Sequence, residues 1–319
     1  MNRRDFLKQG STTAGLALTA RMVEAKSTPT TPIPRRILGK TGERLSIVGM
    51  GGIVVMGVTQ EFANNIVSEA VDRGVNYIDV APSYGDAQER LGPALERYRQ
   101  EVFLACKTGK FDKAGSQAAL DDSLEKLRTD HVDLYQLHAI SSIEQVDQAL
   151  GPNGAIETFV AARKAGKVRY LGFSAHSEEA AIAAMDRFDF DTILFPTNFV
   201  LFTQGHFGPR VIAHAKSKNM GRLAIKSMAK TKWPDSMKPG ERWYQKCWYE
   251  PCSFPGEASL AYRWTLSQPI TAAIPPGYGT FFRLAMDVAQ NYKPLTSEEE
   301  KELLAGAQGV QPIFPQHQA

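Results

Sequence analysis

The sequence predicts an α/β fold of the (β/α)8 (TIM) barrel type, opened by an N-terminal β-hairpin and carrying a long loop after the seventh strand. The first observation behind this prediction is length. The 319 residues, 43% of them hydrophobic, are enough for a barrel of about 250 residues with extensions. The second is a regular alternation of short apolar runs with longer stretches of helical periodicity. The third is the absence of the glycine fingerprint that opens most dinucleotide-binding open sheets.

The hairpin is expected first, because two short runs flank Gly39 and Gly42 after a Pro- and Thr-rich linker. Eight apolar runs follow, and we interpret them as buried strands. In chain order they are Leu45–Val48, Tyr77–Asp79, Val102–Lys107, Val132–His138, Arg169–Ser174, Thr192–Thr197, Leu223–Lys226 and Thr271–Pro275.

Eight stretches between and after these strands have apolar residues spaced near the helical period. In chain order they are Phe62–Arg73, Asp86–Tyr98, Ser116–Leu127, Ala155–Ala165, Glu178–Arg187, Pro209–Lys218, Gly256–Leu266 and Gly279–Gln290. Gly74 and Gly166 follow their helices as C-terminal caps would, and Ser177 precedes Glu178 as an N-terminal cap would.

Strands that alternate with helices pair in parallel, because each crossover helix returns the chain to the same end of the sheet. Eight such units can close into a barrel, which leaves no exposed sheet edge. The alternative is an open doubly wound sheet, which usually begins with G-x-G-x-x-G after its first strand. The segment GMGGIVVMG at Gly49–Gly57 lacks this spacing, so the barrel is favoured.

The N-terminal segment differs in character from the rest of the chain. Arg3 and Arg4 precede Phe6-Leu7-Lys8, and the mildly apolar stretch that follows is far too short to span a bilayer comfortably. The segment resembles a twin-arginine (Tat) export signal. The alternative is a basic disordered tail.

These features divide the chain into four parts. We expect residues 1–25 to be a Tat-type signal peptide, 26–35 a linker, 36–292 the barrel and 293–319 a C-terminal tail. The protein is then expected to be exported by the Tat machinery to the periplasm, without stable membrane insertion. The sequence does not specify an oligomeric state.

Composition excludes several classes of function. The formal net charge is +3 and no basic stripe is present, so nucleic acid is not an expected partner. Three cysteines are too few for a disulfide scaffold, and Cys106, inside an apolar run, is expected to be a core residue. For Cys247 and Cys252, both a small disulfide loop and free thiols stay open. No His or further Cys lies near them, so no metal site is expected.

Polar residues end three successive strands of the predicted barrel. Asp79 ends the second strand, Lys107 the third and His138 the fourth. One strand–helix unit takes about 30 residues, so these side chains occupy equivalent heights on adjacent strands, with Tyr84 on the loop above. Singly they could be a helix cap, a surface lysine, a core histidine and a loop aromatic. Together, at the end of a barrel where active sites are built, they point to catalysis.

The four side chains suit the protonation of a carbonyl oxygen. A buried lysine needs a carboxylate partner, which Asp79 supplies. We expect the Lys107 ammonium to lower the pKa of Tyr84 from about 10, so that the phenol can give a proton to a developing alkoxide. His138 can donate a hydrogen bond to the same oxygen. No side chain delivers hydride, so a nicotinamide or flavin cofactor is required.

The segment GVNYIDVAPSYGDAQERLGPAL (Gly74–Leu95) resembles the signature of the aldo-keto reductase family. LACKTG, SLEKLRTDHVDLYQLH and AARKAGKVRYLGFS match further landmarks of that family in the same order, and the resemblance covers roughly residues 36–290. It implies an NAD(P)-dependent oxidoreductase that reduces an aldehyde or ketone, or oxidises the alcohol. It also implies that Asp79, Tyr84, Lys107 and His138 are catalytic, with Tyr84 as general acid.

The resemblance further implies NADPH as the cofactor, with NADH as the alternative, lying across the barrel mouth. The residues expected to bind it are Gly52, Ile53, Asp79, Ser174, Asn198, Lys226, Ser227, Pro276, Gly277, Gly279, Arg283 and Asp287. Ser174 would bind the carboxamide, with Asn198 replacing an Asn that the family often has at Ala175. Lys226 stands where many members carry an aromatic side chain that stacks on the nicotinamide. The helix start at Gly279 and the Arg283 side chain are expected to hold phosphates.

The segment after the seventh strand, 227–255, is long and rich in aromatic residues. Long loops in compact domains are often functional lids. We therefore predict that Trp233, Trp243 and Trp248 wall the pocket of a small-molecule carbonyl or alcohol substrate, such as a sugar, a quinone or an aldehyde. The alternative is a self-packed surface loop or a patch for a partner.

A second function of a different class stays open. The chain could be a nucleotide-binding redox sensor or docking subunit with little turnover, since the family it resembles contains such members and Lys226 and Ala175 depart from the usual pattern. The complete set of four catalytic candidates favours the oxidoreductase. An isomerase or lyase would require a metal–carboxylate cluster or a second base, and neither is visible in the sequence.

Overall fold

The computed structural model describes residues 31–314, so the predicted Tat signal, residues 1–25, lies outside the described residues. Within 31–314, no helix combines the length and the apolar character needed to cross a bilayer.

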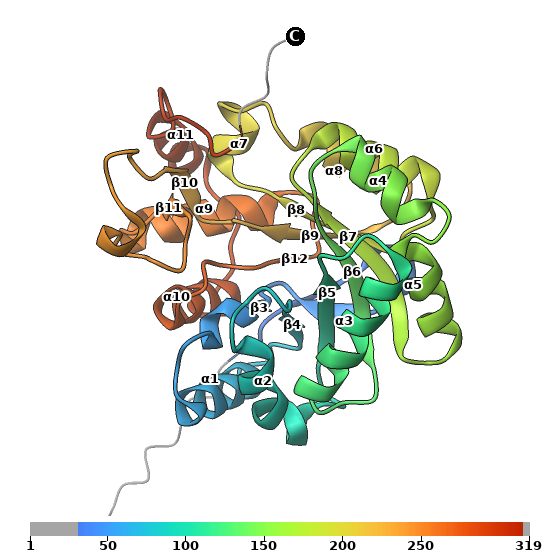
Figure 1. The fold of residues 1–319 in the computed structure, drawn as a ribbon. Coiled ribbons are helices and arrows are strands. Elements are labelled where there is room, and N and C mark those ends of the chain that lie inside the picture. The colour runs from blue at the N-terminus through green and yellow to red at the C-terminus, as the bar shows by residue number, and fades with distance from the viewer. Residues whose placement is uncertain (1–30, 315–319) are drawn as a thin grey trace, which may run out of the picture. The chain divides into compact units, whose positions relative to one another are not determined.

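Eight parallel strands form one curled sheet whose strand order follows the chain (Figure 1). They are β3 (Met50–Gly51), β4 (Tyr77–Asp79), β5 (Phe103–Thr108), β6 (Val132–Ile140), β7 (Val168–Ala175), β8 (Thr192–Pro196), β9 (Gly221–Ile225) and β12 (Ala272–Ala273). A parallel bridge between Val48 and Ala273 brings the last strand back to the first part of the sheet. This arrangement confirms the predicted barrel class.

The N-terminal hairpin is present, formed by β1 (Arg35–Ile37) and β2 (Arg44–Ser46). The prediction that Leu45–Val48 is the first barrel strand was wrong, because the start of this run pairs with β1 and the barrel strand is β3. Leu38 and Leu45 pack with the side chains inside the barrel, among them Leu134 and Leu223. The run is apolar because side chains of the hairpin pack inside the barrel. Local periodicity cannot distinguish such a segment from a barrel strand.

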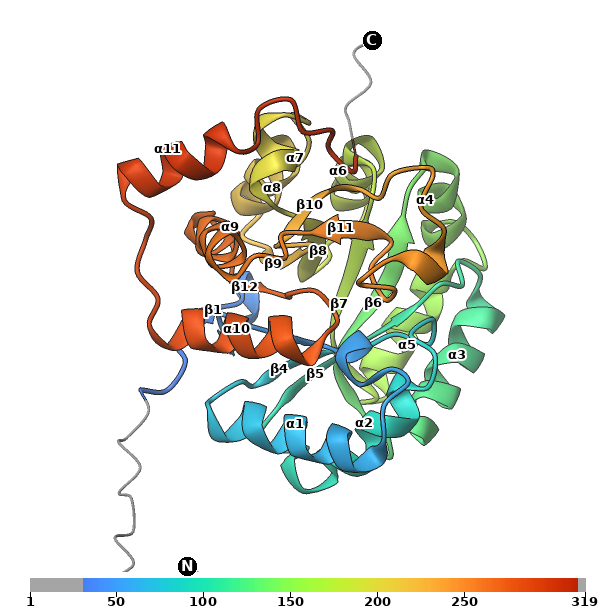
Figure 2. The ribbon, with the colours of Figure 1, turned by 90° about the vertical axis from the view of Figure 1, so that its left-hand side faces the viewer.

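Helices surround the sheet (Figures 1 and 2). They are α1 (Gln60–Asp72), α2 (Ala87–Leu95), α3 (Lys113–Lys126), α4 (Ile143–Leu150), α5 (Ala155–Lys164), α6 (Glu178–Arg187), α7 (Phe199–Thr203), α8 (Pro209–Ser217), α9 (Pro255–Ser267), α10 (Gly279–Gln290) and α11 (Ser297–Ala305). Short 3-10 turns occupy Gly39–Thr41, Gly52–Val55, Glu96–Tyr98 and Pro239–Glu241. Every predicted barrel helix is found, with ends displaced by a few residues at most, whereas α4 and α7 were not predicted.

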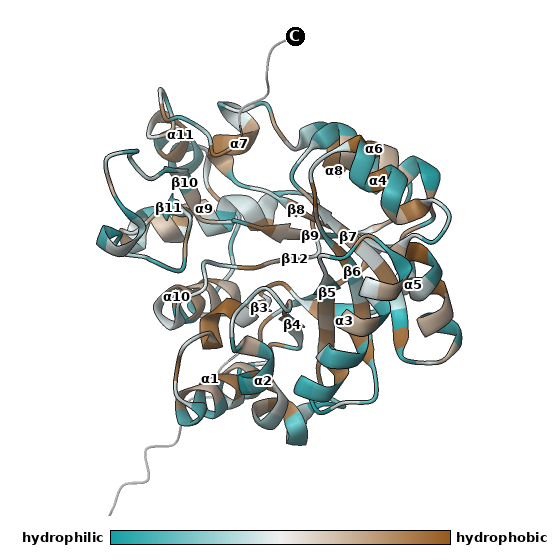
Figure 3. Ribbon diagram, viewed as in Figure 1, coloured by the Kyte–Doolittle hydropathy of each residue, from teal (hydrophilic) through white to brown (hydrophobic). Residues whose placement is uncertain are grey.

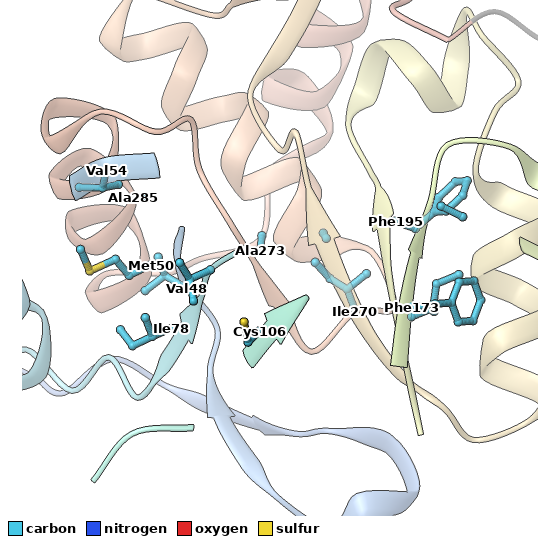
Figure 4. Close-up of a cluster of buried hydrophobic side chains, with 14 of the residues drawn as sticks. Val48, Met50, Val54, Ile78, Cys106, Phe173, Phe195, Ile270, Ala273 and Ala285 are labelled. Atoms are coloured by element: carbon cyan, nitrogen blue, oxygen red, sulfur yellow. The ribbon is translucent and has the colours of Figure 1, made fainter. Parts of the chain in front are cut away.

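Two apolar layers hold the fold together. One fills the barrel interior, and the other lies between the sheet and the helices. Figure 4 shows part of the outer layer, where Val48, Met50 and Ile78 lie close together and Cys106 is among the buried side chains, as predicted. Hydrophilic residues concentrate on the surrounding helices, as α3 and α6 illustrate in Figure 3.

The loop after β9 contains a second hairpin that was not predicted, formed by β10 (Ala229–Lys232) and β11 (Tyr249–Pro251). Between these strands lies the aromatic segment. All three cysteines are buried and free, so Cys247 and Cys252, whose pairing the sequence left open, are not joined in this structure.

The C-terminal part of the described chain returns to the barrel mouth. After α10, α11 packs against α9 and α7 (Figure 2). The chain then continues to Phe314, whose ring stacks on His176 with 5.0 Å between ring centroids. The tail therefore contributes a side chain to the region that the strand ends surround.

Candidate active site

A cavity of about 210 Å³ lies at the carboxyl ends of the barrel strands. The predicted quartet of Asp79, Tyr84, Lys107 and His138 lines it. Asp79 ends β4, Lys107 lies near the end of β5, and His138 lies near the end of β6. Parallel strands of equal direction present their ends on one side of a barrel, which is why residues so far apart in sequence meet here.

Asp79 and Lys107 form a buried ion pair whose side chains are 2% and 1% exposed. The Lys107 Nζ also donates to the Val80 carbonyl at 3.3 Å. The second carboxylate oxygen of Asp79 accepts from Tyr77 OH at 3.2 Å and from Gln136 Nε2 at 3.1 Å. Burial lowers the pKa of Lys107, but the charge and hydrogen bond of Asp79 favour the ammonium, and this pKa lies above its ordinary value. Lys107 therefore stays an ammonium ion.

Tyr84 lies on the loop between β4 and α2, with the Lys107 Nζ 5.1 Å from its ring centroid. Burial raises the pKa of Tyr84 more than the Lys107 ammonium lowers it. The expectation that the pKa of Tyr84 falls is therefore wrong for this structure. A phenol with a raised pKa keeps its proton at neutral pH, so Tyr84 remains a proton donor.

His138 meets the Tyr84 ring edge-on, with 5.8 Å between centroids and an interplanar angle of 84°. Its Nδ1 lies 3.5 Å from the Ser83 hydroxyl. Burial, together with the charges of Lys107 and Lys226, lowers the pKa of His138 to about 3. The imidazole is thus neutral and can offer one N–H to an oxygen in the cavity.

The opposite wall carries a pair that the sequence reasoning missed. His176 lies directly after β7, and its Nε2 is 3.1 Å from the Nζ of Lys226, which directly follows β9. Burial and the Lys107 charge lower the pKa of Lys226 to about 7. Burial and the Lys226 charge lower the pKa of His176 to about 2. A signal for His176 was present in the sequence, since it follows Ser174 by two residues at a strand end.

The residues predicted to bind a cofactor divide into two groups. Those that line the cavity are Ile53, Asp79, Ser174, Lys226, Pro276 and Gly277. Those that do not are Gly52, Asn198, Ser227, Gly279, Arg283 and Asp287.

Several members of the second group have structural partners. The Asn198 side chain caps α7 by accepting from Leu201 N, and it donates to the Lys226 carbonyl at 3.1 Å. Ser227 Oγ donates to the Ile274 carbonyl at 2.8 Å. Arg283 pairs with Glu69 at 2.9 Å. A phosphate approaching Arg283 would therefore have to compete with a carboxylate.

The mouth also has features that fit a dinucleotide. The first turn of α10 has no side-chain cap at Tyr278, so its backbone N–H groups are not bonded by a capping side chain. A Cβ on Gly277 would lie 2.3 Å from Ile53 Cγ2, so only glycine allows these two segments to approach. Ser174 accepts from Ala139 N at 2.8 Å, which leaves its hydroxyl hydrogen free to donate into the cavity. Phosphate and carboxamide thus each have a chemically suitable partner.

Of the three predicted pocket tryptophans, Trp248 lines the cavity and the other two do not. Trp233 is buried, and its indole N–H donates to the Cys247 carbonyl at 2.8 Å. Trp243 is 75% exposed and packs edge-on against Trp233 at 6.1 Å. Much of the loop is therefore self-packed, as the alternative interpretation held. Within residues 31–314, no three metal-ligating side chains gather as a metal site would require.

Comparison with known proteins identifies the family and the fold. Residues 47–250 match the model of the Aldo/keto reductase family. The chain is 28% identical over 222 residues to L-galactose dehydrogenase of Arabidopsis thaliana, covering 62% of this chain and 66% of that protein. It is 32% identical over 179 residues to the 6-dehydroglucose reductase of Novosphingobium aromaticivorans, covering 49% of this chain and 57% of that protein. The chain thus spans about half to two thirds of the length of these relatives.

Among solved structures, the holo form of an aldo-keto reductase from Bacillus halodurans superposes with a TM-score of 0.68 at 22% identity. The match covers 89% of this chain and all of that one. A putative aldo-keto reductase from Pseudomonas aeruginosa gives a TM-score of 0.64 at 24% identity, covering 82% and 97% of the two chains. These likenesses establish the fold.

Proposed function

This chain belongs to the aldo/keto reductase family, and we propose that it is an NAD(P)H-dependent oxidoreductase that reduces an aldehyde or ketone, or oxidises the corresponding alcohol. The observation that carries the proposal is the convergence of Tyr84, the Asp79–Lys107 ion pair and His138 on one cavity. NADPH is the proposed cofactor and NADH the alternative.

Tyr84 is the proposed proton donor. Its phenol is protonated at neutral pH, and the nearby Lys107 ammonium would stabilise the phenolate that remains after the proton has moved to the substrate oxygen. Asp79 keeps Lys107 charged and in place. The neutral His138 orients the same oxygen through its N–H. When bound, the nicotinamide cofactor supplies the hydride that no side chain can provide.

The proposed cofactor contacts follow from the cavity wall. Ile53, Pro276 and Gly277 would line one side of it, Ser174 would bind the carboxamide, and the first turn of α10 would hold a phosphate. Since two of the relatives are named for sugar substrates, an oxygen-rich carbonyl compound is the proposed substrate class.

The test is Tyr84→Phe, with Tyr98→Phe as a matched control. Tyr98 lies outside the cavity, and its hydroxyl donates to Ser68. We expect Tyr84→Phe to reduce kcat for carbonyl reduction by about 100-fold or more, with NADPH binding unchanged as measured by tryptophan fluorescence. We expect Tyr98→Phe to resemble the wild type. Retained turnover in Tyr84→Phe would reject the proton-donor role. Tight nucleotide binding by a wild type that turns over no carbonyl in a broad panel would favour the redox sensor or docking subunit.

Export through the Tat pathway to the periplasm is a further proposal, supported by the Arg3-Arg4 pair ahead of Phe6-Leu7-Lys8. Because that pathway carries folded proteins, the cofactor could be loaded before transport. The expected product is a periplasmic protein lacking its first 20 or 25 residues, as measured by fractionation and mass spectrometry. Arg3→Lys with Arg4→Lys should retain the protein in the cytoplasm, and unchanged export of this variant would contradict the assignment.

A further inference from the structure

We propose that Lys226 and His176 form a carboxylate-binding subsite of the catalytic cavity, so that the substrate is a carbonyl compound that also carries an acid group. The reaction part of this inference rests on the proposed oxidoreductase function, whereas the binding part does not. Together, the two define the substrate class as oxo acids, including oxidised sugar acids.

The charges that line the cavity are unequal in number. Three lysines face it, namely Lys107, Lys226 and Lys246, against one carboxylate, Asp79. Asp79 is already paired with Lys107. The ion pairs of residues 31–314 include none at Lys226, and Lys246 instead donates to the Ile53 carbonyl at 3.2 Å. A cavity with unneutralised positive charge attracts an anion and holds it more strongly than open water would.

The Lys226 ammonium group has N–H donors that are not used within the described residues. An ammonium group has three N–H donors, and the structure gives Lys226 Nζ one partner among the described residues, the Nε2 of His176. The rings of Trp248 and Phe314 lie 5.6 Å and 5.8 Å from the same nitrogen. They shield the ammonium from water without neutralising it. A carboxylate entering the cavity could accept the two remaining hydrogens in a setting of low polarity, where charge-assisted hydrogen bonds are strong.

The backbone at Lys226 is held in an unfavourable conformation. Its φ is +59°, in the left-handed region that residues other than glycine rarely adopt because of steric strain. Asn198 Nδ2 donates to the Lys226 carbonyl at 3.1 Å, and Ala229 N donates to it at 3.0 Å. The surrounding residues therefore maintain a strained turn at the residue that places an ammonium group in the cavity. Asn198, predicted as a cofactor ligand, acts here as a positioning residue.

The substrate is a better source of the anion than the cofactor. Lys226 lies close enough to the proton-transfer residues for its charge to lower the pKa of His138. The features suited to phosphate lie at the uncapped start of α10, shortly after Gly277. An acid group held by Lys226 would thus anchor a short molecule whose carbonyl group lies beside Tyr84 and His138.

The first test measures binding without any reaction. The full chain is titrated with succinate, and with succinamide as the uncharged analogue, following intrinsic tryptophan fluorescence, to which Trp248 beside the subsite contributes. We expect succinate to bind at least tenfold more tightly than succinamide, and Lys226→Met to lose at least tenfold of that affinity. The control is Lys230→Met, because Lys230 is a nearby lysine already paired with Glu257 at 2.6 Å. Unchanged succinate affinity in a folded Lys226→Met protein would overturn the proposal.

A parallel titration with pyrophosphate distinguishes the two sources of an oxyanion. If Lys226→Met weakens pyrophosphate binding but not succinate binding, the subsite belongs to the cofactor and the proposal is overturned. If it weakens succinate binding and leaves pyrophosphate binding within twofold, the substrate assignment is supported.

The second test uses turnover of a matched pair, 4-oxobutanoate and butanal, which differ by the acid group. We expect the wild type to favour 4-oxobutanoate by at least tenfold in kcat/KM, and Lys226→Met to reduce this ratio mainly through KM. Turnover of both compounds with no preference would overturn the subsite while leaving the oxidoreductase function intact. Loss of succinate affinity in Lys226→Met, with no turnover of either compound or of any carbonyl in a broad panel by the wild type, would support the subsite and reject the reductase.

The pH dependence of succinate binding is an independent test of the role of Lys226. Lys226 must be protonated to bind an anion, so affinity should fall by more than about tenfold between pH 7 and pH 9. Lys246 lines the same cavity and burial lowers its pKa too, so Lys246→Met is titrated beside the wild type. The other neighbours should not titrate in that range, because Asp79 keeps Lys107 charged, His138 and His176 are already neutral, and burial raises the pKa values of Cys247 and Tyr249. Affinity that is constant up to pH 9 would contradict the role of Lys226.

Discussion

Two lysines line one cavity, a buried Lys107 and a partly buried Lys226, and their pKa values are shifted in opposite directions. Lys107, on the side formed by β4 to β6, has the Asp79 carboxylate and the Val80 carbonyl as acceptors, and its pKa is raised. Lys226, on the side formed by β7 and β9, has a neutral imidazole and two aromatic rings, and its pKa falls to about 7. Burial lowers the pKa of both groups, so the difference between them comes from their partners.

The difference shows how one cavity can divide its tasks. A buried ion pair whose carboxylate oxygens both accept hydrogen bonds is fixed in charge and geometry, which suits a group that must stabilise a phenolate repeatedly. A lysine without a carboxylate is near the balance between charged and neutral forms, so a ligand can shift it. The charge of Lys107 is therefore already balanced by Asp79. The charge of Lys226 is balanced only when a ligand binds.

The largest expected effect comes from Lys107→Met. It leaves Asp79 as a buried carboxylate without its ion-pair partner, and we expect the free energy of unfolding to fall by about 3–5 kcal/mol, measured by urea denaturation at pH 7. The matched change, Lys226→Met, removes a partly buried cation that lacks a counter-charge and is expected to leave stability equal or higher. An equal loss in both variants would show that Lys226 has a stabilising partner after all, and the contrast would fail.

The pH dependence of stability should separate the two lysines next. An unfolded chain keeps a lysine protonated up to about pH 10.4, whereas folded Lys226 loses its proton near pH 7. Unfolding between these values therefore takes up a proton, and stability rises with pH by up to about 1.4 kcal/mol per unit. The measurement is the difference in unfolding free energy between wild type and Lys226→Met from pH 6 to 9. A difference that does not change over this range would mean that the folded pKa of Lys226 is not lowered.

The smallest effect concerns the aromatic wall on the Lys226 side. Trp248 lines the cavity and lies 5.6 Å from Lys226 Nζ, whereas Trp243 is 75% exposed and does not line it. We expect Trp248→Ala to raise the KM of the best substrate about two- to tenfold, as loss of one aromatic contact would. Trp243→Ala serves as the control and should leave KM unchanged. Equal changes in both would indicate that the whole loop closes over the substrate.

Much of this molecule could be inferred from spacing along the chain. The intervals between Asp79, Lys107 and His138 match the length of one strand–helix unit, and parallel strands bring such positions to a common edge whatever the details of packing. The motif around Tyr84 identified the family for the same reason, since the turn and its side chains are local in sequence. The family match over 47–250 confirms that inference.

Contacts between distant segments required the folded chain. His176 and Lys226 are 50 residues apart, and nothing in either local pattern specifies that their nitrogens meet at 3.1 Å. The sequence likewise could not show that Glu69 forms an ion pair with Arg283, or that the ring of Phe314 in the tail stacks on His176. Periodicity reports which face of an element is apolar, because that depends on neighbours in the chain. Which charged side chains form ion pairs depends on how the barrel closes and where its loops cross. The presence of such a partner decides whether a lysine in the cavity is a fixed cation or one whose charge responds to a ligand.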